Sequence, residues 1–255
     1  MRTVVIIPTR MASQRLANKP LLDINGKTLI QRVYENVLAV YDAADVWIAS
    51  GDQSIADHAK GFGANVIMTD PSLPSGTDRI AAALKEIDPD GTKYDIVVNF
   101  QGDGLNVDPK LNDDLIKLMR KTNADITTVA QEIADQSEIQ NPGVVKIAMG
   151  LLPGARTARC LYFSRSPIPY NRNAEGVARA YWHIGIYVYN AASLRRFVSL
   201  PVGVLEDMEK LEQLRALEDG MSIYAMVVGD TRLDSRAPAD VNTAEDLEEA
   251  RKYIR

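Results

Sequence analysis

The chain has 255 residues, a formal net charge of −5 and 46% hydrophobic residues. This length is enough to bury the core of one domain, and the composition is ordinary for a globular protein. The negative balance argues against a general nucleic-acid binder, which needs a basic face, but it allows a local cationic pocket.

The amino terminus shows no signal-peptide pattern, and no apolar run approaches the length that crosses a membrane. The single cysteine, Cys160, excludes an internal disulfide and is compatible with the cytoplasm. Because no histidine lies near it in the sequence, Cys160 is predicted to be a small buried hydrophobe, not a nucleophile. We therefore expect a cytoplasmic protein with no membrane insertion and no nucleic-acid partner.

The first predicted strand is the continuous apolar run 4–7, which is typical of a strand buried on both faces. Pro8 ends it, because proline cannot donate to a strand ladder. The loop that follows has no acidic residue until Asp23 and carries three cations, Arg10, Arg15 and Lys19. Cations and loop amides at the end of a first parallel strand suit a polyphosphate. The alternative is a solvated loop with three ordinary surface cations.

Elements of an α/β fold follow this loop. After the hairpin signal Asn25-Gly26, apolar residues at helical spacing predict a helix over 29–40. Further elements are predicted in order: a strand at 46–49, a short helix at 55–62 and a strand at 65–68. This alternation predicts a mostly parallel open sheet flanked by helices.

Segment 74–80 is predicted to be a turn followed by a helix start, with Ser75 or Thr77 as the N-cap. Arg79 in the first helical turn can reach a phosphate or a carboxylate. The next buried strand, 96–100, ends in Gln101-Gly102-Asp103. Because the carboxyl ends of parallel strands face the same crevice, Asp103 is predicted to anchor a Mg²⁺ ion that also binds phosphate. An Asx-turn cap is the alternative for this aspartate.

The second half of the chain is predicted to contain an inserted, strand-rich lobe at 141–200, within a single domain that spans 1–255. The elements expected around it are a helix from Asp108 to Leu118, strands at 124–130 and 223–228, a helix at 204–215 and a last helix that opens at 240–247. The acidic first turn of the 204–215 helix is predicted to be a solvated face. Thr243 and Asp246 form a capping-box pair.

Six segments resemble the 3-deoxy-manno-octulosonate (KDO) cytidylyltransferases, a family of CMP-sugar synthetases. The loop pattern of that family, I-P-A-R-x-x-S-x-R-L/F-P-G-K-P-L, is matched by Ile7, Pro8, Arg10, Ser13, Arg15, Leu16, Lys19, Pro20 and Leu21. It is not matched by Thr9, Ala17 and Asn18. The later matches include 75–79, 101–103, 161–170, 181–189 and Glu212-Gln213.

The resemblance implies a Rossmann-like nucleotidyltransferase fold and transfer of CMP from CTP to the hydroxyl of an acidic sugar, with release of pyrophosphate. It also implies Mg²⁺, a homodimer formed through the lobe at 141–200, and a product used for lipopolysaccharide or capsule. The implied catalytic residues are Arg10, Arg15, Lys19 and Asp103. The implied nucleotide-binding residues are Pro8, Arg10, Ser13, Arg15, Lys19, Ser75, Gly76, Arg79 and Gln101.

The resemblance also implies an acceptor-binding set: Arg165, His183, Tyr187, Glu212 and Gln213. By its chemistry, the guanidinium of Arg165 suits bidentate capture of a carboxylate. His183 can bond sugar hydroxyls, although a single histidine between aromatic residues is more often part of a core.

The chain departs from the family at the implied metal site. Gly104 stands where the family has glutamate, and Asn242 stands where it has the aspartate that is its second metal ligand. An amide oxygen can bind Mg²⁺, but without the charge; Asp240 is an alternative ligand. Three rival hypotheses therefore stay open: an 8-amino analogue of KDO as acceptor, a phosphonate or phosphate acceptor, or a nucleotide-binding paralogue without catalysis.

Overall fold

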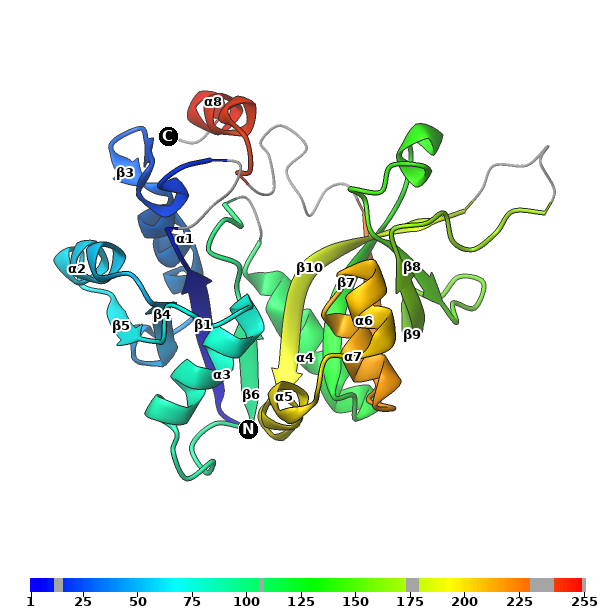
Figure 1. Cartoon of the computed structure of the whole chain (residues 1–255), viewed down its shortest axis with the longest axis horizontal. Helices are drawn as coiled ribbons and strands as arrows, with labels where there is room; N and C mark the ends of the chain where they lie inside the picture. The colour runs from blue at the N-terminus through cyan, green and yellow to red at the C-terminus, as the bar shows by residue number, and fades with distance from the viewer. Residues whose placement is uncertain (12–15, 106–107, 173–178, 230–240, 254–255) are drawn as a thin grey trace. The chain divides into compact units, whose positions relative to one another are not determined.

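The computed structural model describes residues 1–11, 16–105, 108–172, 179–229 and 241–253 (Figure 1). The chain forms two compact units, Met1–Asp113 with Asp230–Arg255, and Asp114–Gly229. The lobe predicted at 141–200 lies wholly inside the second unit, whose bounds are wider.

The sheet of the first unit is parallel throughout, as predicted, in the order β5-β4-β1-β6. Its strands are β1 (Thr3–Thr9), β4 (Val46–Ser50), β5 (Asn65–Met68) and β6 (Ile96–Asn99). The prediction that Pro8 ends the first strand is wrong, because β1 continues to Thr9 and Pro8 still pairs with Ala49 of β4. Val5 pairs with Val46 on one side and with Val98 on the other. The run 4–7 is fully buried, because helices cover both faces of a parallel sheet.

The helices of the first unit follow its strands as expected. They are α1 (Leu29–Leu38), α2 (Gln53–Gly61), α3 (Gly76–Ile87) and α8 (Ala244–Tyr253), with the 3₁₀ turns η1 (Lys19–Leu21) and η2 (Ala43–Asp45). The side chain of Ser75 accepts from Asp78 N at 3.1 Å, so Ser75, not Thr77, is the N-cap of α3. Helix α3 packs on β1, and α1 packs on β4 (Figure 1).

The last helix packs against a hairpin near the start of the chain. Strands β2 (Asp23–Ile24) and β3 (Lys27–Thr28) are joined by Asn25 and Gly26, with φ of 51° and 85°, which confirms the hairpin signal. Asn25 Nδ2 donates to Arg251 O, and Arg251 Nη2 donates to Asp23 O, both at 2.8 Å. Figure 1 shows α8 in red beside the blue hairpin. This contact holds the segment just before α8 in place.

The second unit is rich in strands, as expected of the lobe. Its sheet has the order β10-β7-β11-β9-β8, in which β7 and β11 are parallel and the other pairs are antiparallel. The strands are β7 (Ile126–Glu132), β8 (Lys146–Met149), β9 (Thr157–Ser164), β10 (Tyr181–Asn190) and β11 (Ile223–Val228). The helices are α4 (Lys110–Thr122), which begins in the first unit, α5 (Ala191–Ser199), α6 (Val204–Glu209), α7 (Gln213–Glu218) and the 3₁₀ turn η3 (Gln136–Ile139).

The prediction of one helix over 204–215 is wrong. The chain breaks at Lys210, which adopts a left-handed conformation with φ of 53°, and α6 and α7 lie on either side. The break separates the expected apolar face: Leu211 and Leu214 are buried, whereas Met208 is 77% exposed.

The acidic first turn of α6 is not simply a solvated face. Glu206 is buried, and its carboxylate accepts from Arg215 Nε at 2.7 Å and from Arg215 Nη2 at 2.6 Å. Arg215 also stacks on the ring of Phe197. The bidentate pair joins the first turn of α6 to α7, so it stabilises the two short helices as one corner.

We expect Arg215→Met to reduce the free energy of unfolding by about 3 to 5 kcal/mol, because it leaves the Glu206 carboxylate buried without its partner. Chemical denaturation measures this loss. Glu206→Gln in the same chain should recover part of it. Lys252→Met, which removes the exposed pair with Glu249, is the control and should leave the free energy of unfolding almost unchanged, because solvent screens an exposed ion pair. A loss no larger than that of the control would contradict a stabilising role for the buried pair.

Candidate active site

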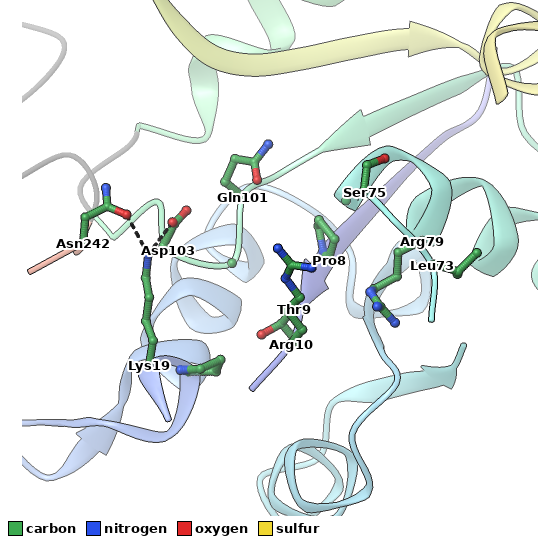
Figure 2. Close-up of a pocket in the computed structure, with 13 residues that line it drawn as sticks. Pro8, Thr9, Arg10, Lys19, Leu73, Ser75, Arg79, Gln101, Asp103 and Asn242 are labelled. Carbon is green, nitrogen blue, oxygen red and sulfur yellow. Dashed lines mark hydrogen bonds and ion pairs between the residues drawn. The ribbon is translucent and has the colours of Figure 1, made fainter. Parts of the chain in front are cut away.

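A cavity of about 470 Å³ opens in the first unit where β1 and β6 end. It is lined by Pro8, Thr9, Arg10, Lys19, Pro20, Leu73, Ser75, Gly76, Arg79, Gln101, Gly102, Asp103 and Asn242. Figure 2 shows Lys19, Asp103 and Asn242 on one side, Leu73, Ser75 and Arg79 on the other, and Pro8, Thr9 and Arg10 between them. The structure thus brings together the predicted nucleotide and metal residues that it describes.

Parallel pairing of β1 with β6 creates this cavity. Val4 pairs with Val97, so the loops after both strands leave the sheet at the same edge. The second loop passes very close to the first: a Cβ at Gly102 would lie 2.7 Å from Pro8 O. Only glycine fits there without moving the backbone, which explains the Gln-Gly-Asp sequence physically.

Lys19 joins the two predicted metal ligands. Its Nζ donates to Asp103 Oδ2 at 2.6 Å and to Asn242 Oδ1 at 3.0 Å (Figure 2). Its side chain is mostly buried. One carboxylate, one ammonium and one neutral amide give this group a net charge of zero.

Asn242 is held by the start of α8. Asp246 Oδ2 accepts from the main-chain N–H groups of Asn242 and Thr243, both at 2.8 Å, and Thr243 Oγ1 accepts from Asp246 N at 3.1 Å. This reciprocal bonding confirms the predicted capping pair. Val241 N also donates to Asp103 O at 3.3 Å, which ties the start of α8 to the loop after β6.

The oxygens of Asp103 and Asn242 fit a small hard cation, because two oxygens that converge on an ammonium group can also converge on Mg²⁺. No cluster of three or more His, Cys, Asp or Glu side chains suited to a metal occurs in the described part of the chain. A metal held by these two residues would therefore need ligands from phosphate or water.

Arg79 forms the opposite wall. It is buried, and its Nη1 donates to Thr69 Oγ1 and, at 3.4 Å, to Asp70 O. Burial lowers the pKa of Arg79; the negative charge of Asp52 raises it, and the positive charge of Arg10 lowers it. Asp52 also accepts from Met11 N at 2.9 Å, so the loop after β1 is anchored to the end of β4.

The second unit holds the predicted acceptor residues, of which His183 and Tyr187 lie together on β10. Their rings are 5.3 Å apart, and the His183 ring also meets Phe163 at 4.9 Å. A bulge between Ile184 and Tyr187 interrupts the pairing with β7. His183 thus has the surroundings of a core residue, the structural alternative that the sequence left open, and its contact with an acceptor stays a prediction.

The hydrogen bonds of Thr128 fix the tautomer of His183. The Thr128 hydroxyl donates to Ile186 O at 2.7 Å, so its oxygen accepts the proton of His183 Nε2, 3.0 Å away. Burial lowers the pKa of His183 to about 3. The imidazole is therefore neutral at physiological pH, with its proton on Nε2.

Arg165 uses its guanidinium on the main chain. Nε donates to Glu209 O at 2.8 Å, Nη1 to Pro142 O at 3.0 Å and Nη2 to Lys210 O at 3.5 Å. Among the described residues, carbonyls thus accept from three of its five N–H groups, which leaves two that can donate to an anion. Gln213 is buried, and within the described chain its Nε2 has no acceptor.

Some predicted residues lie outside the described part of the chain: Ser13, Arg15 and Asp240. Conversely, the sequence did not single out Thr128 or Lys146 as parts of a site. Lys146 lies in the apolar run Val144–Ile147, and a lysine in such a run is the one signal that could have drawn attention to it.

The cytidylyltransferase family model matches residues 4–223. The chain belongs to the cytidylyltransferase family. A 3-deoxy-manno-octulosonate cytidylyltransferase of Paramagnetospirillum magneticum is 41% identical over 99% of this chain and 97% of that protein. One from Bradyrhizobium sp. is 44% identical over the same shares. These matches confirm the resemblance predicted from the sequence.

Solved structures of cytidylyltransferases agree. CMP:2-keto-3-deoxy-manno-octonic acid synthetase, solved with CTP, superposes with a TM-score of 0.87 at 36% identity, over 100% of this chain and 98% of that one. A cytidylyltransferase from Leptospira borgpetersenii, 18% identical with a TM-score of 0.60 over 97% of this chain and 84% of that one, shares the fold. The predicted fold class is confirmed. Among the described helices, none has the length and apolar character needed to span a membrane.

The neutral His183 predicts a specific pH dependence of stability. Its pKa falls from 6.5 in the unfolded chain to about 3 in the folded one, so below pH 6.5 the unfolded chain binds a proton that the folded chain does not. Stability is therefore lost as the pH falls through the window between these values. His183→Gln keeps a donor to Thr128 and does not titrate there.

Urea denaturation of both proteins at pH 7 and pH 5 isolates this effect. Wild type should lose about 2 kcal/mol more than His183→Gln between these pH values. An equal loss in both would mean that His183 is protonated in the folded protein.

Proposed function

We propose that this protein transfers CMP from CTP to the hydroxyl of 3-deoxy-manno-octulosonate or a close acidic relative, and releases pyrophosphate. The observation that carries the proposal is the cavity after β1 and β6, where Lys19, Asp103 and Asn242 meet opposite a wall formed by Ser75 and Arg79. It lies in a chain that is 41% to 44% identical, over almost its full length, to cytidylyltransferases named for this acceptor.

The cations would bind the triphosphate. Arg10 is exposed at the end of β1, between the two walls of the cavity, and Lys19 lies on one of these walls (Figure 2). Fixed positive charges at these two positions would stabilise the charge that develops on the transferred phosphoryl group and on the departing pyrophosphate. Arg15 and Ser13, in the same loop, are proposed to contribute to this binding.

The wall of the cavity opposite Lys19 would bind the cytosine base of CTP. A Cβ at Gly76 would lie 3.6 Å from Pro8 Cγ, so the glycine packs directly against the proline ring. Pro8, Gly76 and Leu73 offer an apolar surface that suits the face of a nucleobase, while Ser75, Gln101 and Arg79 offer polar groups for its edge and for the ribose.

Asp103 and Asn242 are the residues that would hold Mg²⁺. When bound there, Mg²⁺ would polarise the α-phosphate and lower the pKa of the attacking hydroxyl. Lys19 would then donate to a phosphate oxygen of CTP in place of Asp103. Its ammonium group would keep its charge and only change its partner.

The acceptor would be oriented by Arg165, His183, Tyr187, Glu212 and Gln213. Two observations support this role: the two N–H groups of Arg165 that no carbonyl takes, and the buried Gln213 amide without an acceptor. Correct orientation of the hydroxyl is itself a large part of catalysis, since it makes the attack intramolecular. A cytoplasmic location and a homodimer stay predictions.

Release of pyrophosphate from CTP, measured with KDO, with 8-amino-KDO and with a phosphonate, tests the proposal. We expect Mg²⁺-dependent release with KDO. Lys19→Met should reduce the rate by about 100-fold or more, because a charge that stabilises the transition state is lost. Lys27→Met, which removes the exposed pair with Glu35, is the control and should leave the rate unchanged. No release with any acidic sugar, or a near-normal rate for Lys19→Met, would contradict the proposal.

Asn242→Asp separates the hydroxyl acceptor from an already ionised one. With a hydroxyl acceptor, a second carboxylate should hold or raise the rate, because it holds Mg²⁺ more firmly. With a phosphonate or phosphate acceptor, the added negative charge should repel the nucleophile and lower the rate. Titration with Mn²⁺ in the absence of CTP should also show tighter binding by the variant than by wild type. Equal metal affinity would mean that residue 242 is not a ligand.

A further inference from the structure

Lys146, the first residue of β8, is completely buried, which is rare for a lysine. Its three donors are all used: Nζ donates to Asn141 O at 2.9 Å, to Val144 O at 2.6 Å and to Arg165 O at 2.5 Å. All three acceptors are neutral carbonyls, and the described residues include no ion-pair partner for it. Burial lowers the pKa of Lys146, and the nearby positive charge of Arg165 lowers it further. A buried ammonium group is costly unless all of its N–H groups are hydrogen-bonded, so it holds the three carbonyls in fixed positions around Nζ.

Lys146 and Arg165 hold the same loop from two neighbouring strands. Lys146 pairs with Ser164 across the β8–β9 ladder, so Arg165 directly follows the position opposite it. Lys146 binds the first and last residues of the loop Asn141–Val144, and the Arg165 guanidinium binds Pro142 O between them. Removal of the lysine would therefore release both the loop and the main chain of Arg165.

Arg165 carries this constraint to the break between α6 and α7. Its Nε donates to Glu209 O, while its main-chain N–H donates to Glu209 Oε2 at 2.9 Å. Ser164 Oγ donates to the other oxygen of the same carboxylate. Glu209 is the last residue of α6, and the left-handed Lys210 follows it. Arg165 therefore fixes the turn from which Glu212 and Gln213 continue.

Strand β8 also reaches the strand that carries His183. His183 N donates to Val145 O at 2.8 Å, and Trp182 pairs with Lys146. The short segment Val145–Lys146 is thus bonded directly to the strand of His183 and, through Arg165, to the turn before Gln213.

We propose that Lys146 is a positioning residue for the acceptor: its buried ammonium fixes the main chain of Arg165, and with it the guanidinium and the turn at Glu209–Lys210 that present polar groups to an acidic sugar. This inference rests on the proposed function. Lys146 touches no substrate in this scheme and acts only through Arg165. It also adds a second positive charge behind the guanidinium, which offsets the negative charges of Glu209 and Glu138 nearby.

Lys146→Met and Lys146→Arg test this role. Methionine has a similar length but no charge and no donor, whereas arginine keeps the charge with different donor geometry. We expect Lys146→Met to raise the KM for the acceptor by about tenfold or more, the effect of about one lost charge-assisted hydrogen bond, while the KM for CTP stays within about twofold of wild type. Lys146→Arg should raise the acceptor KM less. Lys117→Met, at an exposed site on α4, is the matched control and should change neither.

A double-mutant cycle with Arg165→Lys separates positioning from a general structural role. If Lys146 acts through Arg165, Lys146→Met should add little to the acceptor KM once Arg165 has been changed. If Lys146→Met does not fold, Lys146→Arg takes its place in the cycle. Equal rises in both KM values, or fully additive effects, would overturn the proposal. Wild-type turnover of KDO is measured first, so its failure would count against the proposed function and not against the role of Lys146.

Discussion

The parallel pairing of β1 with β6 is the constraint on which the cavity depends. Because the two strands run in the same direction and share a register, their following loops must leave from one edge, and the cation-bearing loop meets the Gln101–Asp103 loop there. The approach is so close that Gly102 has no room for a side chain. The contact between Lys19 and Asp103 depends on this edge, because it forms between the loops that follow the two strands.

The electrostatics of the site follow from the two residues that differ from the family pattern, Gly104 and Asn242. With an amide at position 242, the group formed by Lys19, Asp103 and Asn242 is neutral. A neutral site attracts a divalent cation weakly, whereas a triphosphate brings several negative charges of its own. Metal and nucleotide should therefore bind with mutual dependence in this protein, and each would be the other's main source of affinity.

The sequence predicted most of the elements because their signals are local. The strand at 65–68, the strand at 223–228 and the N-cap at Ser75 depend on residues a few positions apart, and the structure has them where the pattern placed them. The loop after the first strand and Asp103 were also predictable as neighbours, since parallel topology alone brings strand ends together.

What the sequence could not provide are the buried charges. Glu206 was predicted to be solvated because its partner Arg215 lies beyond the helix break at Lys210. No glycine or proline in the sequence indicates that break. Lys146 donates to three main-chain carbonyls, one of which belongs to Arg165, 19 residues away, and a carbonyl group gives no signal in the sequence. The direction of the Arg165 guanidinium has the same cause: it is set by the main chain of Pro142 and Glu209.

The contact between α8 and the β2–β3 hairpin has a consequence for the order of folding. Asn242 and Lys19 are 223 residues apart in the sequence, and Asn242 reaches Lys19 from the start of a helix that is bonded to residues 23–25. Closing so long a loop costs more chain entropy than pairing neighbouring strands and helices. The side of the cavity that contains Asn242 thus depends on contacts that are among the least local in the first unit, and we expect it to form after the parallel sheet.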